Sequence, residues 1–530
     1  MSLTSTSHRD PDKFPAVQLF LLVQQADLGF PSAIVRLAEP IALTSIFPYA
    51  WAFIKRLQIG NEDDASFYAG LLISSFALAE ASMGMYWGGL SDRVGRKPVL
   101  LLGCVGTMFS MIMVGFATNI WVAVLGRAIG GLLNGNIGVI QTMVGELVTK
   151  PEHELPFVWS IGTIIGPAIG GTFADPHESF PNMFPKGSLF DRFPYLLPNL
   201  ICAGMLLMSI VLGYFLLEET HPDMQPRVLL PDDTFLSENT PLIETSDAMK
   251  RPAVDLRDEN YGTMRARDIK NTTPAPKTIG KQPSYNVFSK RIMAVIVSLS
   301  IFTYHSMTFD HLLPIFFEDD KVPTNHPFGI FKVLSPFYSP GGLGLSLQSV
   351  GMVMAVQGVI ALFMQAVVFP LMAERVGVYR LFILITVFHP IVYFIMPSLL
   401  FVPERFLYPA IYLCLAVRNF FSILLYPLLL ILIKEATPSS SVLGKVNGLA
   451  ASAGAACRMV APPVAGYLYS VGRKMDCTAL AWYGSTFVAI IGAIQCFQVK
   501  RNRSRDSLPE DGLSQHSDSD GEVTPAAEAA

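Results

Sequence analysis

The stretch GGLSDRVGRK at residues 88–97 is the most informative part of this sequence. It is short, it begins with two glycines, and it carries three basic side chains, Arg93, Arg96 and Lys97. Glycine permits a sharp turn, and Lys and Arg gather on the cytosolic side of membrane proteins. An apolar run of about 20 residues, enough to cross a bilayer, lies on each side of it. The stretch therefore predicts a cytosolic turn between two transmembrane helices.

The composition agrees with a membrane protein. Of the 530 residues, 51% are hydrophobic and only 15% are charged, against about 25% charged in a typical soluble domain. The net charge of -4 gives no basic excess, so we expect no nucleic-acid partner. The six cysteines form no CxxC pair, and most lie in apolar runs. We therefore expect no metal site, no cofactor and no disulfide framework.

The apolar runs fall into two sets of six. Backbone polar groups inside a membrane need internal partners, so runs of this length must be helical. The sequence predicts an all-α membrane protein with 12 transmembrane helices in two six-helix halves. The runs lie near 33–54, 68–88, 98–117, 121–145, 156–174, 194–217, 291–317, 347–372, 379–401, 406–433, 443–471 and 477–499.

The remaining segments are polar and complete the domain plan. The stretch between the two sets of runs is rich in proline and charge, which predicts a disordered linker. The parts are a cytosolic N-terminal segment (1–32), the first bundle (33–217), a disordered cytosolic linker (218–290), the second bundle (291–499) and a disordered cytosolic tail (500–530).

The basic residues set the orientation. The turn at 88–97 and the start of the tail at 500–505 are basic, which places both in the cytosol. The opposite loops also carry charge, so the bias is moderate. Those outer cations are Lys55, Arg56, Arg473 and Lys474.

The turn at 88–97 resembles the pattern G-x-L-x-D-R-x-G-R-K/R that the major facilitator superfamily carries after its second span. A worn copy, AERVG at 373–377, follows the eighth span, as an internal repeat predicts. The resemblance implies a conformational switch, in which the charge cluster latches the two halves in one state and releases them in the other. The residues concerned are Gly88, Asp92, Arg93, Gly95, Arg96 and Lys97.

A second glycine-rich run, GTIIGPAIGG at 162–171, lies in the fifth span. Small residues let helix backbones approach closely, and a proline can kink the helix. The run resembles the G-x-x-x-G-P-x-x-G-G pattern of the antiporter branch, which implies export in exchange for protons. Tight packing with no bearing on direction is the alternative. The matching residues are Gly162, Gly166, Pro167, Gly170 and Gly171.

Three further stretches narrow the resemblance to one branch of the superfamily. RLAEPIALTSIFPY at 36–49, NGN at 134–136 and DHLLP at 310–314 resemble a fungal drug:proton antiporter-like branch, related to the zinc-induced facilitator-like carriers. This implies a small-molecule substrate, protons as the coupling ion and a monomer in a lipid bilayer. It also implies the plasma membrane, with the vacuolar membrane as the alternative.

Four ionisable residues inside the predicted spans are candidates for proton coupling: Arg127, Asp310, Glu39 and Glu80. Such residues are costly in a membrane and usually mark a pathway. In this superfamily an arginine in the fourth span, as Arg127 is here, is linked to proton coupling; snorkelling outward is its alternative. Glu39 either titrates or pairs with Arg36.

Asp310 has histidines nearby in sequence, His305 and His311, which suggests a proton relay. The alternative is a polar cluster at the outer end of the seventh span. Arg418 and Arg458, in the tenth and eleventh spans, are expected to pair within the bundle.

These features favour a secondary active transporter, with proton-coupled export of drugs, toxins or secondary metabolites by alternating access as the leading hypothesis. The alternatives are an importer or uniporter of a metabolite or metal chelate, and a nutrient sensor that transports nothing. We find no catalytic spacing of nucleophile, metal ligands or phosphate loop, so no enzyme is expected.

Two stretches depart from the family pattern. QQADLGFPS at 24–32 interrupts the start of the first span, and KPEHELP at 150–156 makes a shorter turn than expected. A wrongly spliced gene prediction would explain both, and sequencing the transcript would test this.

Overall fold

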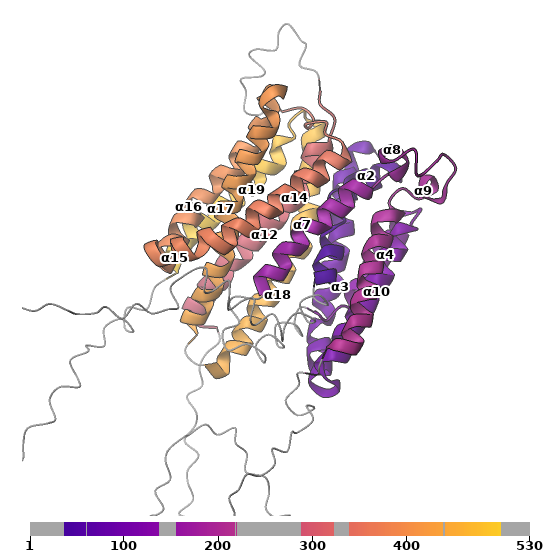
Figure 1. The fold of residues 1–530 in the computed structure, drawn as a ribbon. Helices are drawn as coiled ribbons and strands as arrows, with labels where there is room; N and C mark the ends of the chain where they lie inside the picture. Colours follow the sequence, from indigo (N-terminus) through magenta and orange to yellow (C-terminus); the bar gives the residue numbers. More distant parts are fainter. Residues whose placement is uncertain are drawn as a thin grey trace, which may run out of the picture. The chain divides into compact units, whose positions relative to one another are not determined.

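The structure is a computed structural model that describes residues 37–59, 61–136, 155–217, 219, 288–322, 339–437 and 440–499 (Figure 1). All of these residues belong to one compact unit. The N-terminal segment, nearly all of the linker and the tail lie outside the described residues. So do both irregular stretches, apart from the two last residues of the second.

Helices occupy the predicted spans of the first half. The first predicted span begins as a helix over 37–44, breaks at 45–49, where Pro48 lacks a backbone N–H, and resumes as α2. The helices are α2 (Ala50–Arg56), α3 (Ala65–Val94), α4 (Arg96–Gly115), α5 (Ile120–Leu133), α7 (Leu155–Phe173) and α10 (Leu196–Leu216), with short turns at Glu62–Asp64, α8 (Pro176–Ser179) and α9 (Leu189–Arg192).

The second half also consists of helices at the predicted spans. They are α12 (Lys290–Glu318), α14 (Leu347–Phe363) continued through a π-helical turn into α15 (Phe369–Val376), α16 (Val378–Ile395), α17 (Glu404–Ala436), α18 (Ser440–Lys474) and α19 (Ala479–Gln495).

Every predicted span thus overlaps a helix of the described part, where the β-structure consists of two isolated bridges. Eight of the described helical segments are long and apolar enough to cross a membrane. The all-α membrane fold is confirmed, and the full count of twelve crossings stays a prediction. Many large apolar side chains are exposed on the helices, among them Phe215 and Leu413, as expected of a lipid-facing surface.

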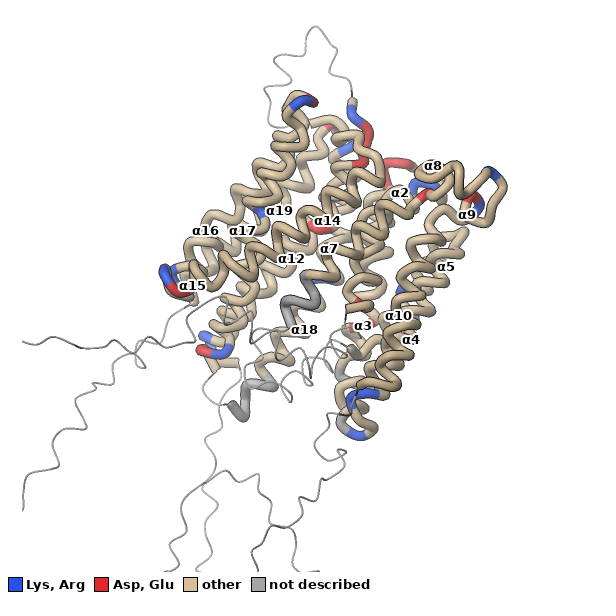
Figure 2. Tube along the Cα trace, in the orientation of Figure 1, with Lys and Arg blue, Asp and Glu red and all other residues tan. Residues whose placement is uncertain are grey.

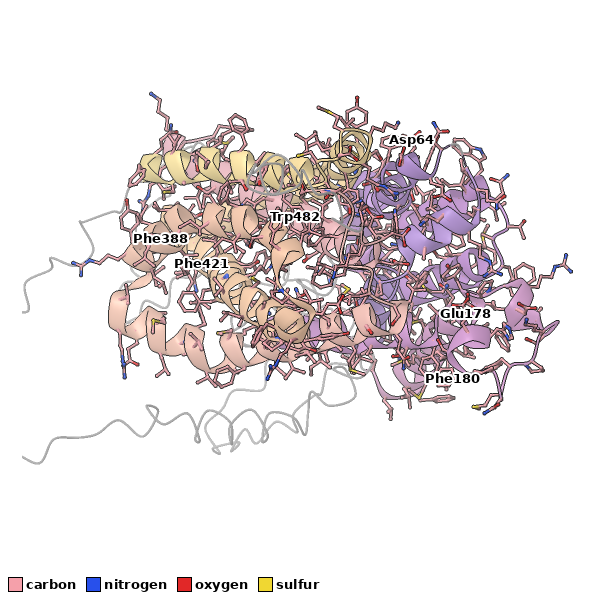
Figure 3. The ribbon with its side chains drawn as sticks, turned by 90° about the horizontal axis from the view of Figure 1, so that it is seen from above. Asp64, Glu178, Phe180, Phe388, Phe421 and Trp482 are labelled. Atoms are coloured by element: carbon pink, nitrogen blue, oxygen red, sulfur yellow. The ribbon has the colours of Figure 1, made fainter. Side chains whose placement is uncertain are left out.

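The two halves lie side by side when the bundle is viewed from above (Figure 3). We call the end that carries the turn at 88–97 the inner end and the opposite one the outer end. Glycines allow the helix backbones of the two halves to touch. A Cβ added to Gly70 of α3 would collide with Pro462 of α18, and one added to Gly171 of α7 would collide with Gly351 of α14.

Toward the inner end this contact is lost. Gly88 on α3 and Gly448 on α18 each lie eighteen residues, or five helical turns, inward of a glycine that touches the opposite half, Gly70 and Gly466 respectively. They therefore lie on the same helix faces. No described atom lies within 4 Å of a Cβ built on either one. Among the described residues, the halves therefore touch toward the outer end, whereas Gly88 and Gly448, toward the inner end, have no neighbour from the opposite half within that distance.

Candidate functional site

Helix α3 continues to Val94, so Gly88 and Gly89 are helical and the expectation that they form the turn is wrong. The turn consists of Gly95 alone, and it is fixed by that glycine and by a distant carboxylate. Gly95 adopts φ 105°, a conformation that L-residues other than glycine rarely adopt. Glu219 accepts hydrogen bonds from the backbone N–H groups of Arg96 (2.8 Å) and Lys97 (3.1 Å). These N–H groups belong to the first turn of α4 and have no partner inside the helix. Arg96 is buried and donates to the Ser91 hydroxyl at 2.7 Å.

The hydrogen bonds described for the turn reach residues of the first half and Glu219, which follows α10. Lys97 also donates to the carbonyl of Tyr214 at the end of α10, and Arg93 is exposed. Figure 2 shows the basic residues at this end of α3 and α4. The side chain of Asp92 lies outside the described ones. In the worn copy, Gly377 separates α15 from α16. It has a positive φ of 83°, as Gly95 has between α3 and α4.

The antiporter-type run packs closely on two neighbours. Gly162, Gly166 and Gly170 lie four residues apart on α7, and a Cβ on any of them would collide with residues 40–45, at the end of the first helix and the start of its break. Thr44 donates to the carbonyl of Gly162 at 3.0 Å. Gly171 faces α14 of the other half. The run therefore positions both the first helix and the interface.

Glu39 is held by amides. Its two carboxylate oxygens accept hydrogen bonds from Asn134 (2.6 Å) and Asn136 (2.8 Å), and its side chain is buried. Both asparagines lie at the end of α5. Their hydrogen bonds to Glu39 therefore join α5 to the first helix. Arg36, the expected alternative partner, lies outside the described residues.

Glu80 and Arg127 occupy adjacent helices of the first half. Arg127 is 3% exposed, its guanidinium carbon lies 4.5 Å from the centre of the Phe76 ring, and no ion pair to it is found among the described residues. Arg127 lies two turns from the start of α5, and its side chain is buried against Phe76 in the helix bundle. The alternative, that it snorkels outward, is therefore wrong. Glu80 has a buried oxygen with no hydrogen-bond donor in the described part.

Asp310 pairs with Arg418. The Asp310 Oδ1 atom of α12 lies 2.8 Å from Nη2 of Arg418 on α17. This confirms the expectation that Arg418 pairs within the bundle. The predicted histidine contacts are not made, because His305 bonds the hydroxyl of Tyr393 at 2.7 Å and His311 approaches the carbonyl of Ser66 at 3.3 Å.

His389 is a residue that the sequence did not single out. It lies within an apolar run of α16, stacks on Tyr393 and approaches its hydroxyl at 3.4 Å. Its ring centre is 4.7 Å from that of His305, and both rings are buried. The described residues contain no group of three or more potential metal ligands.

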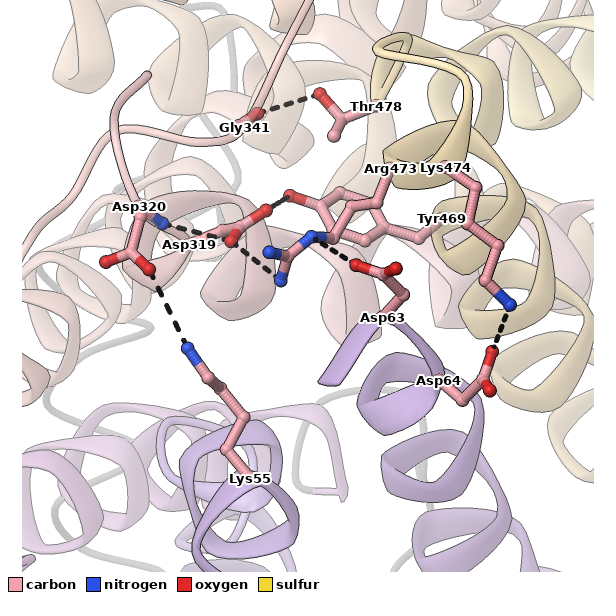
Figure 4. A network of polar contacts seen from close by, with 10 residues as sticks. All are labelled: Lys55, Asp63, Asp64, Asp319, Asp320, Gly341, Tyr469, Arg473, Lys474 and Thr478. Carbon is pink, nitrogen blue, oxygen red and sulfur yellow. Dashed lines mark hydrogen bonds and ion pairs between the residues drawn. The ribbon is translucent and has the colours of Figure 1, made fainter. Parts of the chain in front are cut away.

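Charged residues join the two halves at the outer end (Figure 4). Arg473 of α18 lies 3.4 Å from Asp63 of the first half and 3.1 Å from Asp319 of the second. Asp319 also accepts a hydrogen bond from Tyr469 at 2.9 Å. Burial raises the pKa of the Asp319 carboxyl, and Arg473 and Tyr469 act in the opposite direction. Lys474 pairs with Asp64 at 2.7 Å. We use the name outer network for these residues together with the Lys55–Asp320 pair: Lys55, Asp63, Asp64, Asp319, Asp320, Tyr469, Arg473 and Lys474.

All four outer cations that weaken the charge bias have carboxylate partners. Lys55 lies 3.8 Å from Asp320 of the second half, and Arg56 lies 3.3 Å from Asp175 of its own half. Pairing explains why these cations are found on the side where basic residues are usually sparse.

The fold and these groups define a class: a polytopic helical membrane protein of two halves, with ionisable groups between its helices. Residues 41–335 match the Major Facilitator Superfamily. The "Major facilitator superfamily multidrug transporter mfsB" of Aspergillus fumigatus is 36% identical over 95% of this chain and 87% of its own. The "Protein ZINC INDUCED FACILITATOR 1" of Arabidopsis thaliana is 26% identical over 83% of each chain. Among solved structures, a D-xylose–proton symporter has the same fold, with a TM-score of 0.58, 15% identity, and coverage of 88% of this chain and 96% of that one.

The chain belongs to the Major Facilitator Superfamily, a family of membrane transporters. The resemblance to a fungal multidrug branch with zinc-induced facilitator-like relatives is confirmed.

Proposed function

We propose that this protein exports small organic compounds in exchange for protons and acts as a carrier, not an enzyme. The observation that carries the proposal is the Asp310–Arg418 pair. Its carboxylate side chain is 39% exposed although it lies within a helix bundle, whereas the guanidinium is 6% exposed. A reachable intramembrane carboxylate can take up and release a proton. The fungal multidrug relative supports small organic compounds as substrates.

The contacts between the halves support transport by alternating access. The closed outer end and parted inner end correspond to an inward-open state, in which substrate enters from the cytosol. The outer network then acts as an outer gate. The turn at 88–97 acts as the inner latch in the opposite state, when Gly88 and Gly448 approach. Glu39, Glu80 and Arg127 complete the proton-coupling set in the first half.

Accumulation in pump-deficient yeast tests this proposal. Cells expressing the chain would be given fluorescent dyes of different charge, with and without a protonophore. We expect lower accumulation that the protonophore abolishes, and loss of this effect in Asp310→Asn. Glu62→Gln, on an exposed outer turn, is the matched control and should keep export. Equal accumulation of every dye, with the protein at the cell surface, would contradict broad export and favour a narrow metabolite carrier or a sensor.

A further inference from the structure

Arg418 is fixed on several sides. Its Nη2 atom donates to Asp310 Oδ1 and, at 3.3 Å, to the Ser306 hydroxyl, while Nη1 donates to Asn419 Oδ1 at 3.2 Å. Its guanidinium carbon lies 4.4 Å from the centre of the Phe309 ring, within the range of a cation–π contact. The cation therefore has little freedom to leave its site.

Asn419 is fixed in turn. Its amide donates to the carbonyl of Gln357 on α14 at 2.8 Å. The Arg418 site thus joins α12, α14 and α17. α14 is also the helix whose Gly351 touches Gly171 of the first half. A charge change at this site acts on a helix that forms the interface between the halves.

Asp310 is held less completely than its partner. Only its Oδ1 atom has a hydrogen-bond donor among the described residues. The Asp310 side chain is 39% exposed, whereas that of Arg418 is 6% exposed, and no described donor contacts Oδ2. The pair combines a fixed cation with an accessible carboxylate.

Other titratable groups lie nearby, but none is described in contact with Asp310. Tyr393 of α16 is engaged by His305, and His311 of α12 approaches Ser66. Arg458 lies on the adjoining α18, with no ion pair within 4 Å in the described part. Gln357 of α14, which accepts from Asn419, and Trp482 of α19, which packs on Phe309, are uncharged.

We propose that Arg418 is the positioning residue for proton binding: it holds Asp310 in place and sets the pH at which this carboxylate takes up a proton. The proposal rests on the proposed function, in which Asp310 carries the coupled proton. A cation in contact favours the ionised carboxylate. Protonation of Asp310 removes the counter-ion of a buried guanidinium, which is costly and so favours a rearrangement around α14.

Dicyclohexylcarbodiimide, which reacts with protonated carboxyl groups, provides the test. The full chain in lipid nanodiscs would be labelled across a pH series, and the peptide containing Asp310 would be quantified by mass spectrometry. Asp310→Asn marks the background, and the peptide containing Glu80 is the internal reference. In Arg418→Gln we expect the pH midpoint of labelling to rise by about 1 to 3 units. Arg418→Lys, which keeps the charge, should show a smaller rise.

Arg418→Gln leaves Ser306 and Asn419 without their donor and can fail to fold. The double variant Ser306→Ala/Asn419→Ala keeps the guanidinium but removes two of its anchors, and should raise the midpoint by less than Arg418→Gln. An unchanged midpoint in every folded variant would overturn the proposal. Labelling needs no substrate, so a shifted midpoint without proton-driven transport would reject the proposed function while retaining the role of Arg418.

Discussion

Lys474 Nζ lies 2.7 Å from the Asp64 carboxylate, so an ion pair joins the outer end of α18 to the residue before α3. These residues are 410 positions apart and belong to different halves. Three further carboxylates pair with Arg473 or Lys55 close by, which makes the outer end the charged contact between the halves (Figure 4).

Reversing one charge of the exposed pair should open the outer end, and reversing both should close it again. Asp64→Lys places two cations together, whereas Asp64→Lys/Lys474→Asp restores attraction. Because the Asp64 and Lys474 side chains are 35% and 46% exposed, solvent screens their attraction, and we expect a small change in the population of the open state. The measurement is labelling of Ser66→Cys, buried at the interface, by an impermeant maleimide from outside.

The control for this labelling is Met183→Cys, 73% exposed on an outer loop, which should react equally in each background. Each background without an added cysteine corrects for the native thiols. If labelling were unchanged by Asp64→Lys, the outer network would not act as a gate.

The buried Asp319–Arg473 pair of the outer network should tolerate substitution less well than the exposed Asp64–Lys474 pair. The Asp319 side chain is 1% exposed, and Arg473→Gln leaves it without its cation. Breaking a buried pair costs about 3 to 5 kcal/mol. We expect a clear fall in the melting temperature in detergent, partly recovered by Arg473→Gln/Asp319→Asn. A fall no larger than that of Lys474→Gln would contradict this assignment.

The close glycine contacts at Gly170 and Gly171 should also tolerate substitution poorly. Gly170→Ala and Gly171→Ala each place a methyl group against a neighbouring backbone, at a cost of about 1 to 3 kcal/mol. Gly204→Ala on α10 is the matched control, because no described atom lies within 4 Å of its added methyl group. The yield of monodisperse protein and its melting temperature measure the difference. Similar values for all three would show that close packing at 170–171 is not required.

Glu219 should stabilise the basic turn. Glu219→Ala removes the acceptor for two N–H groups of α4, and lost caps cost about 0.5 to 2 kcal/mol. We expect a lower melting temperature and weaker transport, with Glu62→Ala on an exposed turn unchanged. A melting temperature equal to wild type would argue against capping by Glu219.

Local patterns predicted the fold well. The apolar runs gave the helices, and the glycines of the two repeated turns adopt the positive φ that their positions require, at Gly95 and Gly377. The small residues at 162–171 do let backbones touch. These features depend on residues that are close together in the sequence, so they can be predicted from one sequence.

The partners of the charged residues depend on tertiary packing and could not be predicted residue by residue. His311 follows Asp310 directly, but consecutive residues on a helix point about 100° apart, so it faces Ser66 of α3 instead. Asp310 meets Arg418 from 108 positions away, and Glu219 reaches Arg96 from 123 positions away. His389 gave no signal, because it is a single polar residue within an apolar run.

The most direct test of the account is proton movement during export. Purified protein would be reconstituted into liposomes that contain a pH-sensitive dye, and a gradient of a compound exported in yeast would be imposed. We predict that the compound moves down its gradient while protons move the opposite way, and that Asp310→Asn abolishes the proton movement. Substrate movement without any proton movement, and with no effect of an imposed pH gradient, would contradict proton-coupled export.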